Sequence, residues 1–213
     1  MKLIAFGDSF TYGLVKKPYR LSEKDSKQQS FIKQLEKNIS IFDKSINFAE
    51  CGASNLQIAS ILYREIKKLD TKDCFVFVGW TVFSRNQYWN NKYKEYRTYD
   101  TNKHSELIEK LYLDTEYSVL AVENLLNKLK IPFCMIQAFH DHGDEDFTLI
   151  DKSYNIKNWI NWSKPNNTLF DICAKRYLSN ENYSDSKIYH KNRDFRNEFI
   201  AEYRHPSKKD MLK

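Results

Sequence analysis

Residues 1–13, MKLIAFGDSFTYG, contain a short apolar run that is followed at once by Gly-Asp-Ser. Residues 2–6 are typical of a buried strand. Gly7 would let the backbone turn sharply, so Ser9 would stand where the strand ends. A serine there is either a reactive hydroxyl or the N-cap of a following helix.

Beyond this stretch, apolar bursts alternate with helical periodicity up to about residue 139. Further strands are predicted at residues 46–49, 74–78 and 131–139. Helices are predicted at residues 31–39, 57–69 and 107–129, the last broken near Asp114 and Thr115. This alternation predicts an α/β fold with a central parallel sheet and helices on both faces. After His140 the pattern weakens, and only residues 169–178 suggest another helix.

The bulk composition is that of a globular protein. The 213 residues are 29% charged and 41% hydrophobic, which predicts one domain over residues 1–213 and excludes a disordered chain. The apolar runs are far shorter than the ~20 residues of a membrane-spanning helix, and the first is too brief for a signal peptide. We therefore expect a cytoplasmic protein without a membrane partner. The four cysteines are widely spaced and predict reduced residues of the core.

Residues 85–97, RNQYWNNKYKEYR, are both basic and aromatic in a chain of net charge +6. Such a segment could stack on bases or sugars while its cations meet phosphate, or it could be a solvated loop. No nucleic-acid motif or periodic basic face accompanies it, so we expect no nucleic-acid partner.

Ligands of open parallel sheets bind beyond the carboxyl ends of the strands. The residues that follow the predicted strands are 7–9, 51–55, 79–81 and 140–142. They supply a serine, glycine turns with backbone amides, a further hydroxyl and two histidines. A nucleophile, amide donors and a base are the components of an acyl-transfer site.

Three short motifs resemble those of the SGNH, or GDSL, hydrolase family. They are GDSFTYG at residues 7–13, NFAECGASN at 47–55 and EYRHPS at 202–207. The resemblance implies a flavodoxin-like three-layer α/β/α fold. It also implies an esterase that removes an acetyl or acyl group, possibly from a carbohydrate, without a metal or organic cofactor.

The resemblance implies a catalytic role for each of three residues. Ser9 would attack the ester carbonyl and form an acyl-enzyme, and His205 would take up the serine proton. Glu202, where the family has Asp, would orient the imidazole. One extra methylene displaces that carboxylate by roughly 1.5 Å.

The oxyanion donors implied by the resemblance are the backbone amides of Ser9 and Gly52. The family's third block is Gly-x-Asn-Asp, with the Asn as a further donor, and here Thr81 takes the place of that Asn. A hydroxyl donates one hydrogen bond over a shorter reach than an amide. Asn55 is the alternative third donor.

Other polar residues near the predicted rim have two interpretations each. We expect Arg85, Trp80 and His140 to contact substrate, although Arg85 could equally form a surface salt bridge. The run HDHGDED at 140–146 could hold zinc or manganese, or it could be an acidic loop, and we assign no metal. Ser54 with Gln57 predicts a capping box for the 57–69 helix. His205 could instead precede a last helix capped by Ser207.

Our first hypothesis is therefore a serine esterase acting on a small-molecule or carbohydrate ester. The alternative is a catalytically weakened member of the same fold that binds carbohydrate, with the Tyr- and Trp-rich residues 88–99 stacking on sugar rings. A third hypothesis is metal-dependent hydrolysis by the 140–146 cluster. The sequence does not indicate the oligomeric state.

Overall fold

The structure is a computed structural model that describes residues 1–13, 27, 30–81, 85, 87–90, 95–98, 108–137, 200–201 and 205–206. The description of residues 87–90, 95–98, 108–109, 200–201 and 205–206 is limited to the backbone. The predicted helix at 169–178, the 140–146 cluster, Cys173 and the cap at Ser207 lie outside the described residues.

A four-stranded parallel sheet forms the centre of the molecule. Its strands are β1 (Lys2–Gly7), β2 (Lys44–Asn47), β3 (Cys74–Trp80) and β6 (Phe133–Gln137), in the order β2-β1-β3-β6. This is the flavodoxin-like order, in which the first strand lies between the second and the third. The strand at 46–49 was predicted two residues too late, and the other strands lie where the apolar runs indicated them.

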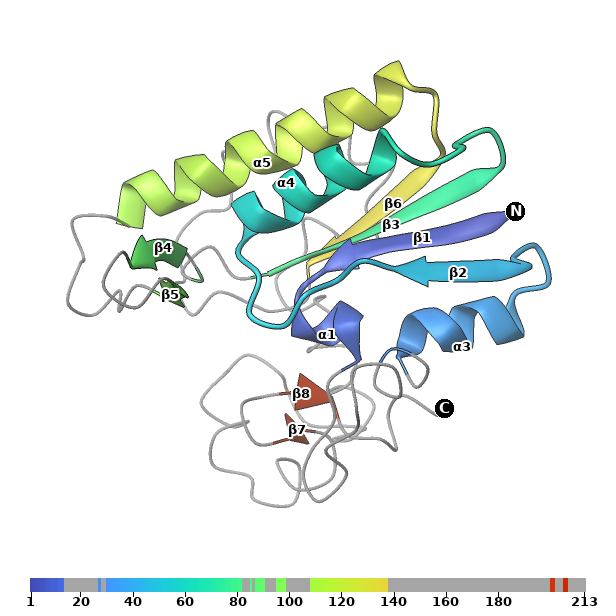
Figure 1. The fold of residues 1–213 in the computed structure, drawn as a ribbon, viewed down its shortest axis with the longest axis horizontal. Coiled ribbons are helices and arrows are strands. Elements are labelled where there is room, and N and C mark those ends of the chain that lie inside the picture. Colours follow the sequence, from blue (N-terminus) through green and yellow to red (C-terminus); the bar gives the residue numbers. More distant parts are fainter. Residues whose placement is uncertain are drawn as a thin grey trace, which may run out of the picture.

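Helices cover both faces of the sheet (Figure 1). On one face α4 (Asn55–Ile66) and α5 (Ile108–Lys128) bury the larger core, which includes Phe6, Val78 and Leu126. On the other, α3 (Phe31–Asn38) packs Ile32 against Leu3 and Ala5, beside the short helix α1 (Ser9–Tyr12). The three-layer α/β/α fold is confirmed. No helix in the described part of the chain is long and apolar enough to cross a membrane.

The predicted break in the third helix is wrong, because α5 runs unbroken through Asp114 and Thr115. The Ser118 hydroxyl donates to the Asp114 carbonyl at 2.6 Å, and the Thr115 hydroxyl accepts from Asn55 on α4 at 3.2 Å. The helix thus continues through these residues while Thr115 contacts α4. Here tertiary packing outweighs the low helix propensity of Asp and Thr.

Of the two hydrogen bonds that make up the predicted capping box of α4, one is present. Ser54 is the N-cap, and its hydroxyl accepts from the Gln57 amide at 3.3 Å. The Gln57 side chain donates to Glu50 at 2.9 Å instead of returning to Ser54.

The described cysteines are free thiols, but they are not all core residues. Cys74 is buried in β3, and burial raises the pKa of the Cys134 thiol in β6 to about 12. Cys51 is exposed in the turn after β2, so the expectation of a core position was wrong for this residue.

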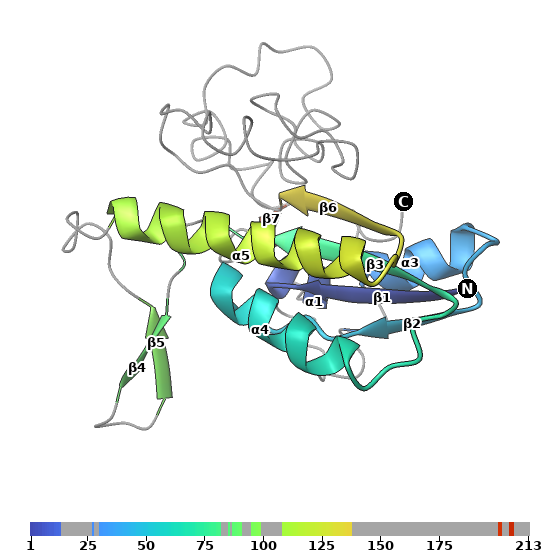
Figure 2. The same ribbon diagram turned by 90° about the horizontal axis from the view of Figure 1, so that it is seen from above.

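Residues 85–97 do not form a simple loop. They contain β4 (Gln87–Asn90) and the first three residues of β5 (Glu95–Thr98), which pair antiparallel with Trp89 opposite Tyr96. Figure 2 shows this hairpin projecting away from the sheet and its helices. In the last described part of the chain, β7 (Ile200–Ala201) pairs with β8 (His205–Pro206), so His205 lies in a short strand.

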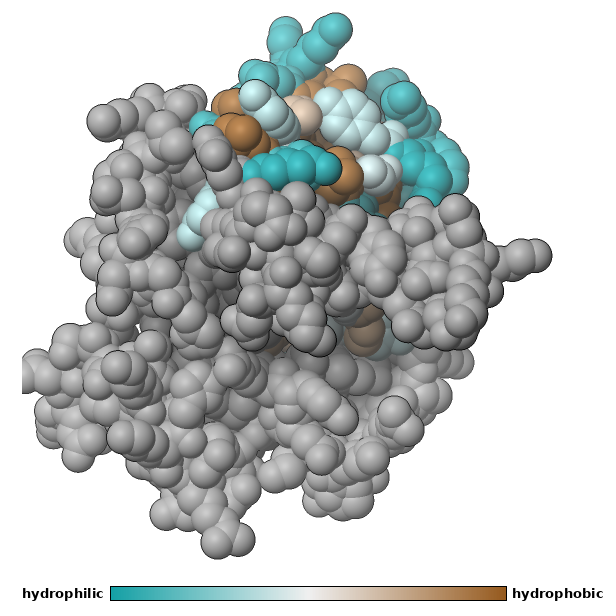
Figure 3. Space-filling model, turned by 90° about the vertical axis from the view of Figure 1, so that its left-hand side faces the viewer, coloured by the Kyte–Doolittle hydropathy of each residue, from teal (hydrophilic) through white to brown (hydrophobic). Residues whose placement is uncertain are grey.

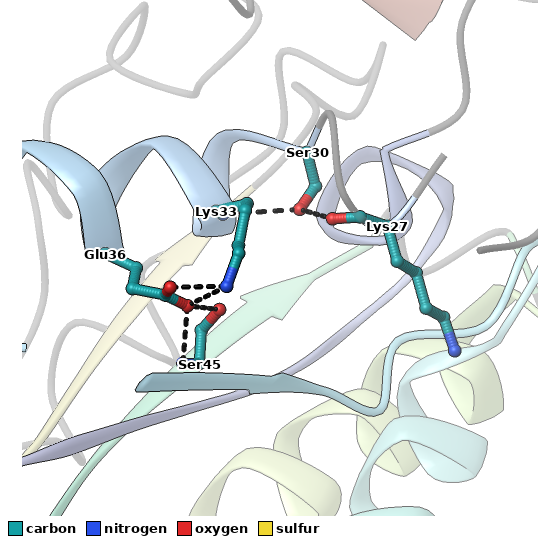
Figure 4. Close-up of polar contacts among 5 residues, drawn as sticks. All are labelled: Lys27, Ser30, Lys33, Glu36 and Ser45. Atoms are coloured by element: carbon teal, nitrogen blue, oxygen red, sulfur yellow. Dashed lines mark hydrogen bonds and ion pairs between the residues drawn. The ribbon is translucent and has the colours of Figure 1, made fainter. Parts of the chain in front are cut away.

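A polar clamp joins α3 to the edge strand β2 (Figure 4). Glu36 accepts hydrogen bonds from the Ser45 backbone amide at 2.6 Å, from the Ser45 hydroxyl and from Lys33. Burial alone would raise the pKa of Glu36, but the hydrogen bonds from Lys33 and Ser45 outweigh it and hold this pKa below 4.5. The clamp fixes α3 against the sheet edge.

We expect Glu36→Gln to lower the free energy of unfolding by about 1–2 kcal/mol at pH 7, because it removes a charge-assisted acceptor from three donors. The lowered pKa makes this contribution fully present above pH 4.5 and lost as the pH falls through the folded-state pKa. Urea denaturation at pH 7 and in acid measures both effects. The exposed Glu50→Gln variant is the control, and an equal loss in the two variants would contradict the clamp.

Candidate functional site

The turn after β1 presents Ser9 at the carboxyl end of the sheet. Asp8 is the N-cap of α1, and its Oδ1 accepts from the Phe10 amide at 3.0 Å. Ser9 is thus the first residue of the helix and not its cap, which removes the structural alternative for this serine. The helix ends at Gly13, whose φ of 96° lies in the left-handed region that favours glycine.

The Ser9 side chain is buried and makes no hydrogen bond within the described part of the chain. The residue is 2% exposed, and its Oγ has no hydrogen-bond partner among the described residues. Leaving a buried hydroxyl unpaired costs about 1–3 kcal/mol. An unpaired buried polar group requires an explanation, and a catalytic role is one that fits a serine in this position.

Gly7 and Gly79 have no side chains and so leave space for Thr11, which packs against this turn. The two glycines are neighbours in the sheet, and a Cβ on either would lie 2.2 or 2.3 Å from the Thr11 hydroxyl oxygen. Gly7 therefore serves a close approach within a strand and not a sharp turn, which corrects the sequence interpretation. Thr11 is fully buried against the two strand ends and holds the first turn of α1 in place.

Asp8 is fully buried and joins β1 to the end of β3. Its Oδ2 accepts from the Thr81 hydroxyl at 2.9 Å and from Arg85 Nη1 at 2.7 Å. Burial raises the pKa of Asp8 above 3.8, while the Arg85 charge and the hydrogen bonds from Thr81, Phe10 and Thr11 act against this rise. Arg85 thus forms an ion pair, but with a fully buried carboxylate and not at the surface as the alternative interpretation had it.

Asn55 clamps the backbone just beyond β3. Its Oδ1 accepts from the Thr81 amide at 2.9 Å, and its Nδ2 donates to the Thr81 carbonyl at 3.0 Å and to the Thr115 hydroxyl at 3.2 Å. Both side chains expected as a third oxyanion donor, Thr81 and Asn55, therefore donate to other groups of the protein.

The Gly52 turn lies beside the Ser9 turn. Beyond β2, the Phe48 amide donates to the Ala5 carbonyl at 2.8 Å and the Glu50 amide donates to the Gly7 carbonyl at 3.0 Å. This pairing carries the chain along β1 to its end. Gly52 follows with a φ of 79°, a conformation that favours glycine.

The last described strand lies next to the first helix. Residues of β8, which holds His205, have Cα atoms within 8 Å of residues of α1, which starts at Ser9 (Figure 1). The backbone thus brings residues 205–206 close to the helix that begins at Ser9. The proposed partner acid, Glu202, lies outside the described residues, as does His140.

Trp80 was expected to contact substrate, but it lies in the core. It is 2% exposed and packs in the larger core under α4 and α5.

Figure 3 shows the end of the molecule toward which the parallel strands run. The described side chains that are visible there lie toward the top of the view and include both hydrophobic and hydrophilic residues. The described residues include no group of acidic, histidine and cysteine side chains that could hold a metal ion.

Two solved structures are similar to this chain. A lipase/acylhydrolase from Enterococcus faecalis is 14% identical, with 99% of this chain and 89% of that chain covered and a TM-score of 0.42. A lipolytic protein of the G-D-S-L family from Desulfitobacterium hafniense DCB-2 is 15% identical over 66% of this chain, with a TM-score of 0.39. This chain spans 62% of the length of that second protein. No family model and no curated protein matches the chain. The three-layer fold is established by this chain's own sheet and helices, and the resemblance to the SGNH hydrolases by its motifs.

Proposed function

We propose that this protein is a serine esterase that cleaves a carboxylic ester through an acyl-enzyme at Ser9. The observation that carries the proposal is the buried Ser9 hydroxyl, without a partner among the described residues, on a turn that β8 approaches. The substrate class is an acetyl or acyl ester, possibly on a carbohydrate.

In the proposed reaction, Ser9 Oγ attacks the ester carbonyl while His205 takes up its proton. Collapse of the tetrahedral intermediate breaks the bond to the alcohol, which leaves with the proton from His205. Water then attacks the acyl group, again giving its proton to His205, and Ser9 regains a proton when the acid departs. Glu202 would orient the imidazole and stabilise its charged form.

The proposed oxyanion hole uses the backbone amides of Ser9 and Gly52, which lie on neighbouring turns. Each such donor contributes on the order of 3 kcal/mol to lowering the barrier. Because Thr81 and Asn55 donate to protein groups, they are not assigned to the hole. The proposed hole therefore depends on the backbone.

The second candidate, a carbohydrate-binding protein of weakened catalysis, is favoured by this same engagement of Thr81 and Asn55. It predicts no turnover across a panel of acyl esters, together with glycan binding measurable by calorimetry. Turnover by the serine separates the two functions.

Covalent labelling tests the first proposal directly. A fluorophosphonate is expected to add to Ser9, because its phosphorus accepts the serine oxygen as an ester carbonyl would. Peptide mass spectrometry locates the adduct, which should be absent in Ser9→Ala and retained in Ser60→Ala, an exposed serine on α4. An unlabelled wild-type protein, or an adduct elsewhere, would overturn the proposal.

A further inference from the structure

The buried Asp8–Arg85 pair sits directly beside the proposed nucleophile. Asp8 is 0% exposed, while 22% of the Arg85 side chain remains exposed, and the two are 77 residues apart in sequence. Arg85 lies between the end of β3 and the hairpin strand β4. Among the described residues it is the charged group that acts most strongly on Asp8, and it lowers the pKa of that carboxyl.

A carboxylate is strongly disfavoured in a fully buried position unless charge and hydrogen bonds compensate it. Asp8 has both, because its Oδ1 accepts from Phe10 and its Oδ2 accepts from Thr81 and Arg85. Without Arg85 the carboxyl would keep its burial and lose the positive charge of its ion pair. It would then take up a proton at a higher pH.

Protonation of Asp8 would alter the turn that holds Ser9. An ionised carboxylate only accepts hydrogen bonds, whereas a protonated one carries a hydroxyl that donates. Asp8 is the acceptor in its hydrogen bonds with the Phe10 amide, the Thr81 hydroxyl and Arg85. A neutral carboxyl is a weaker acceptor than a carboxylate, so protonation would weaken the cap on α1, and Ser9 is the adjacent residue.

We propose that Arg85 is a positioning residue, which keeps Asp8 ionised so that the capped turn holds Ser9 in the geometry for attack. The consequence for acyl transfer rests on the proposed function. The effect on Asp8 and on the turn rests on the contacts alone, so the two can be tested separately.

The first test follows the Asp8 carboxyl by carbon-13 NMR titration. The Asp8 resonance is assigned by its loss in Asp8→Asn. In Arg85→Met the Asp8 pKa is expected to rise by about 1–3 pH units above its wild-type value. Arg85→Lys keeps the positive charge, so the Asp8 pKa in this variant should stay close to its wild-type value. This variant keeps the proposal testable if Arg85→Met unfolds. Arg64→Met is the control, since Arg64 is an arginine of α4, 58% exposed and paired with Glu65. An unmoved Asp8 titration would overturn the proposal.

The second test measures the turn itself. Hydrogen exchange of the Phe10 amide, which donates to Asp8, should become at least about tenfold faster in Arg85→Met and stay unchanged in Arg64→Met. Fluorophosphonate labelling of Ser9 in Arg85→Met should decline with acid at a higher pH than in the wild type. Unchanged exchange and an unchanged labelling profile would overturn the positioning role. A wild-type protein that is not labelled at Ser9 would refute the esterase, while titration and exchange would still decide the role of Arg85.

Discussion

Ser9→Ala lowers kcat/KM for p-nitrophenyl acetate by about 10⁴-fold or more, if Ser9 forms the acyl-enzyme. The fold should hardly change, because the Ser9 hydroxyl makes no hydrogen bond within the described residues. Because an unpaired buried hydroxyl costs about 1–3 kcal/mol, its removal should leave the free energy of unfolding unchanged or raise it. Steady-state turnover and urea denaturation of the same preparations provide the two measurements.

Ser60→Ala is the matched control for this substitution. The Ser60 hydroxyl donates to the Leu56 carbonyl at 2.8 Å on an exposed part of α4, so turnover should be unchanged. A fall of similar size in His205→Ala would support the role of the imidazole. Turnover that survives Ser9→Ala and disappears with a chelator would contradict the serine mechanism and favour metal-dependent hydrolysis by residues 140–146.

Gly7→Ala and Gly79→Ala should both destabilise the protein, but only the second should be rescued by Thr11→Ala. A Cβ on Gly79 meets the Thr11 hydroxyl oxygen at 2.3 Å, and its next nearest atoms are 3.6 Å away. A Cβ on Gly7 also meets Thr11 Cβ at 2.6 Å and the Gly79 carbonyl oxygen at 2.9 Å. Thr11→Ala removes the hydroxyl but leaves these last two contacts.

We expect Gly79→Ala to cost about 1–3 kcal/mol and Gly7→Ala about 3 kcal/mol or more. Thr11→Ala alone removes an unpaired hydroxyl and also a buried methyl group, so it should cost about 1 kcal/mol by itself. Urea denaturation of the single and double variants yields the coupling energy for each glycine. Additive losses for Gly79→Ala with Thr11→Ala would show that the close approach does not fix the turn.

The parallel sheet and its helices were largely predictable from the sequence, because each apolar run and each helical stripe is a local pattern. Residues 74–78 identified β3, and Ser54 identified the start of α4. The break near Asp114 was predicted wrongly, since the Thr115 hydroxyl is bonded by Asn55 of α4 and the Asp114 backbone carbonyl accepts from Ser118 in the next helical turn. The hairpin was missed because its cross-strand pairs, such as Trp89 with Tyr96, carry no helical or simple apolar period.

Ser9 and Gly52 could be singled out from the sequence, because each lies in a short contiguous motif at the end of a predicted strand. The surroundings of Ser9 could not. Arg85 reaches Asp8 across 77 residues and Asn55 reaches Thr81 across 26, contacts that exist only once β1 and β3 are paired and α4 is in place. The register of the sheet likewise places Gly7 beside Gly79, and the two glycines leave space for the Thr11 side chain. Local patterns specify which elements form, whereas the distances between distant side chains are set by how those elements pack.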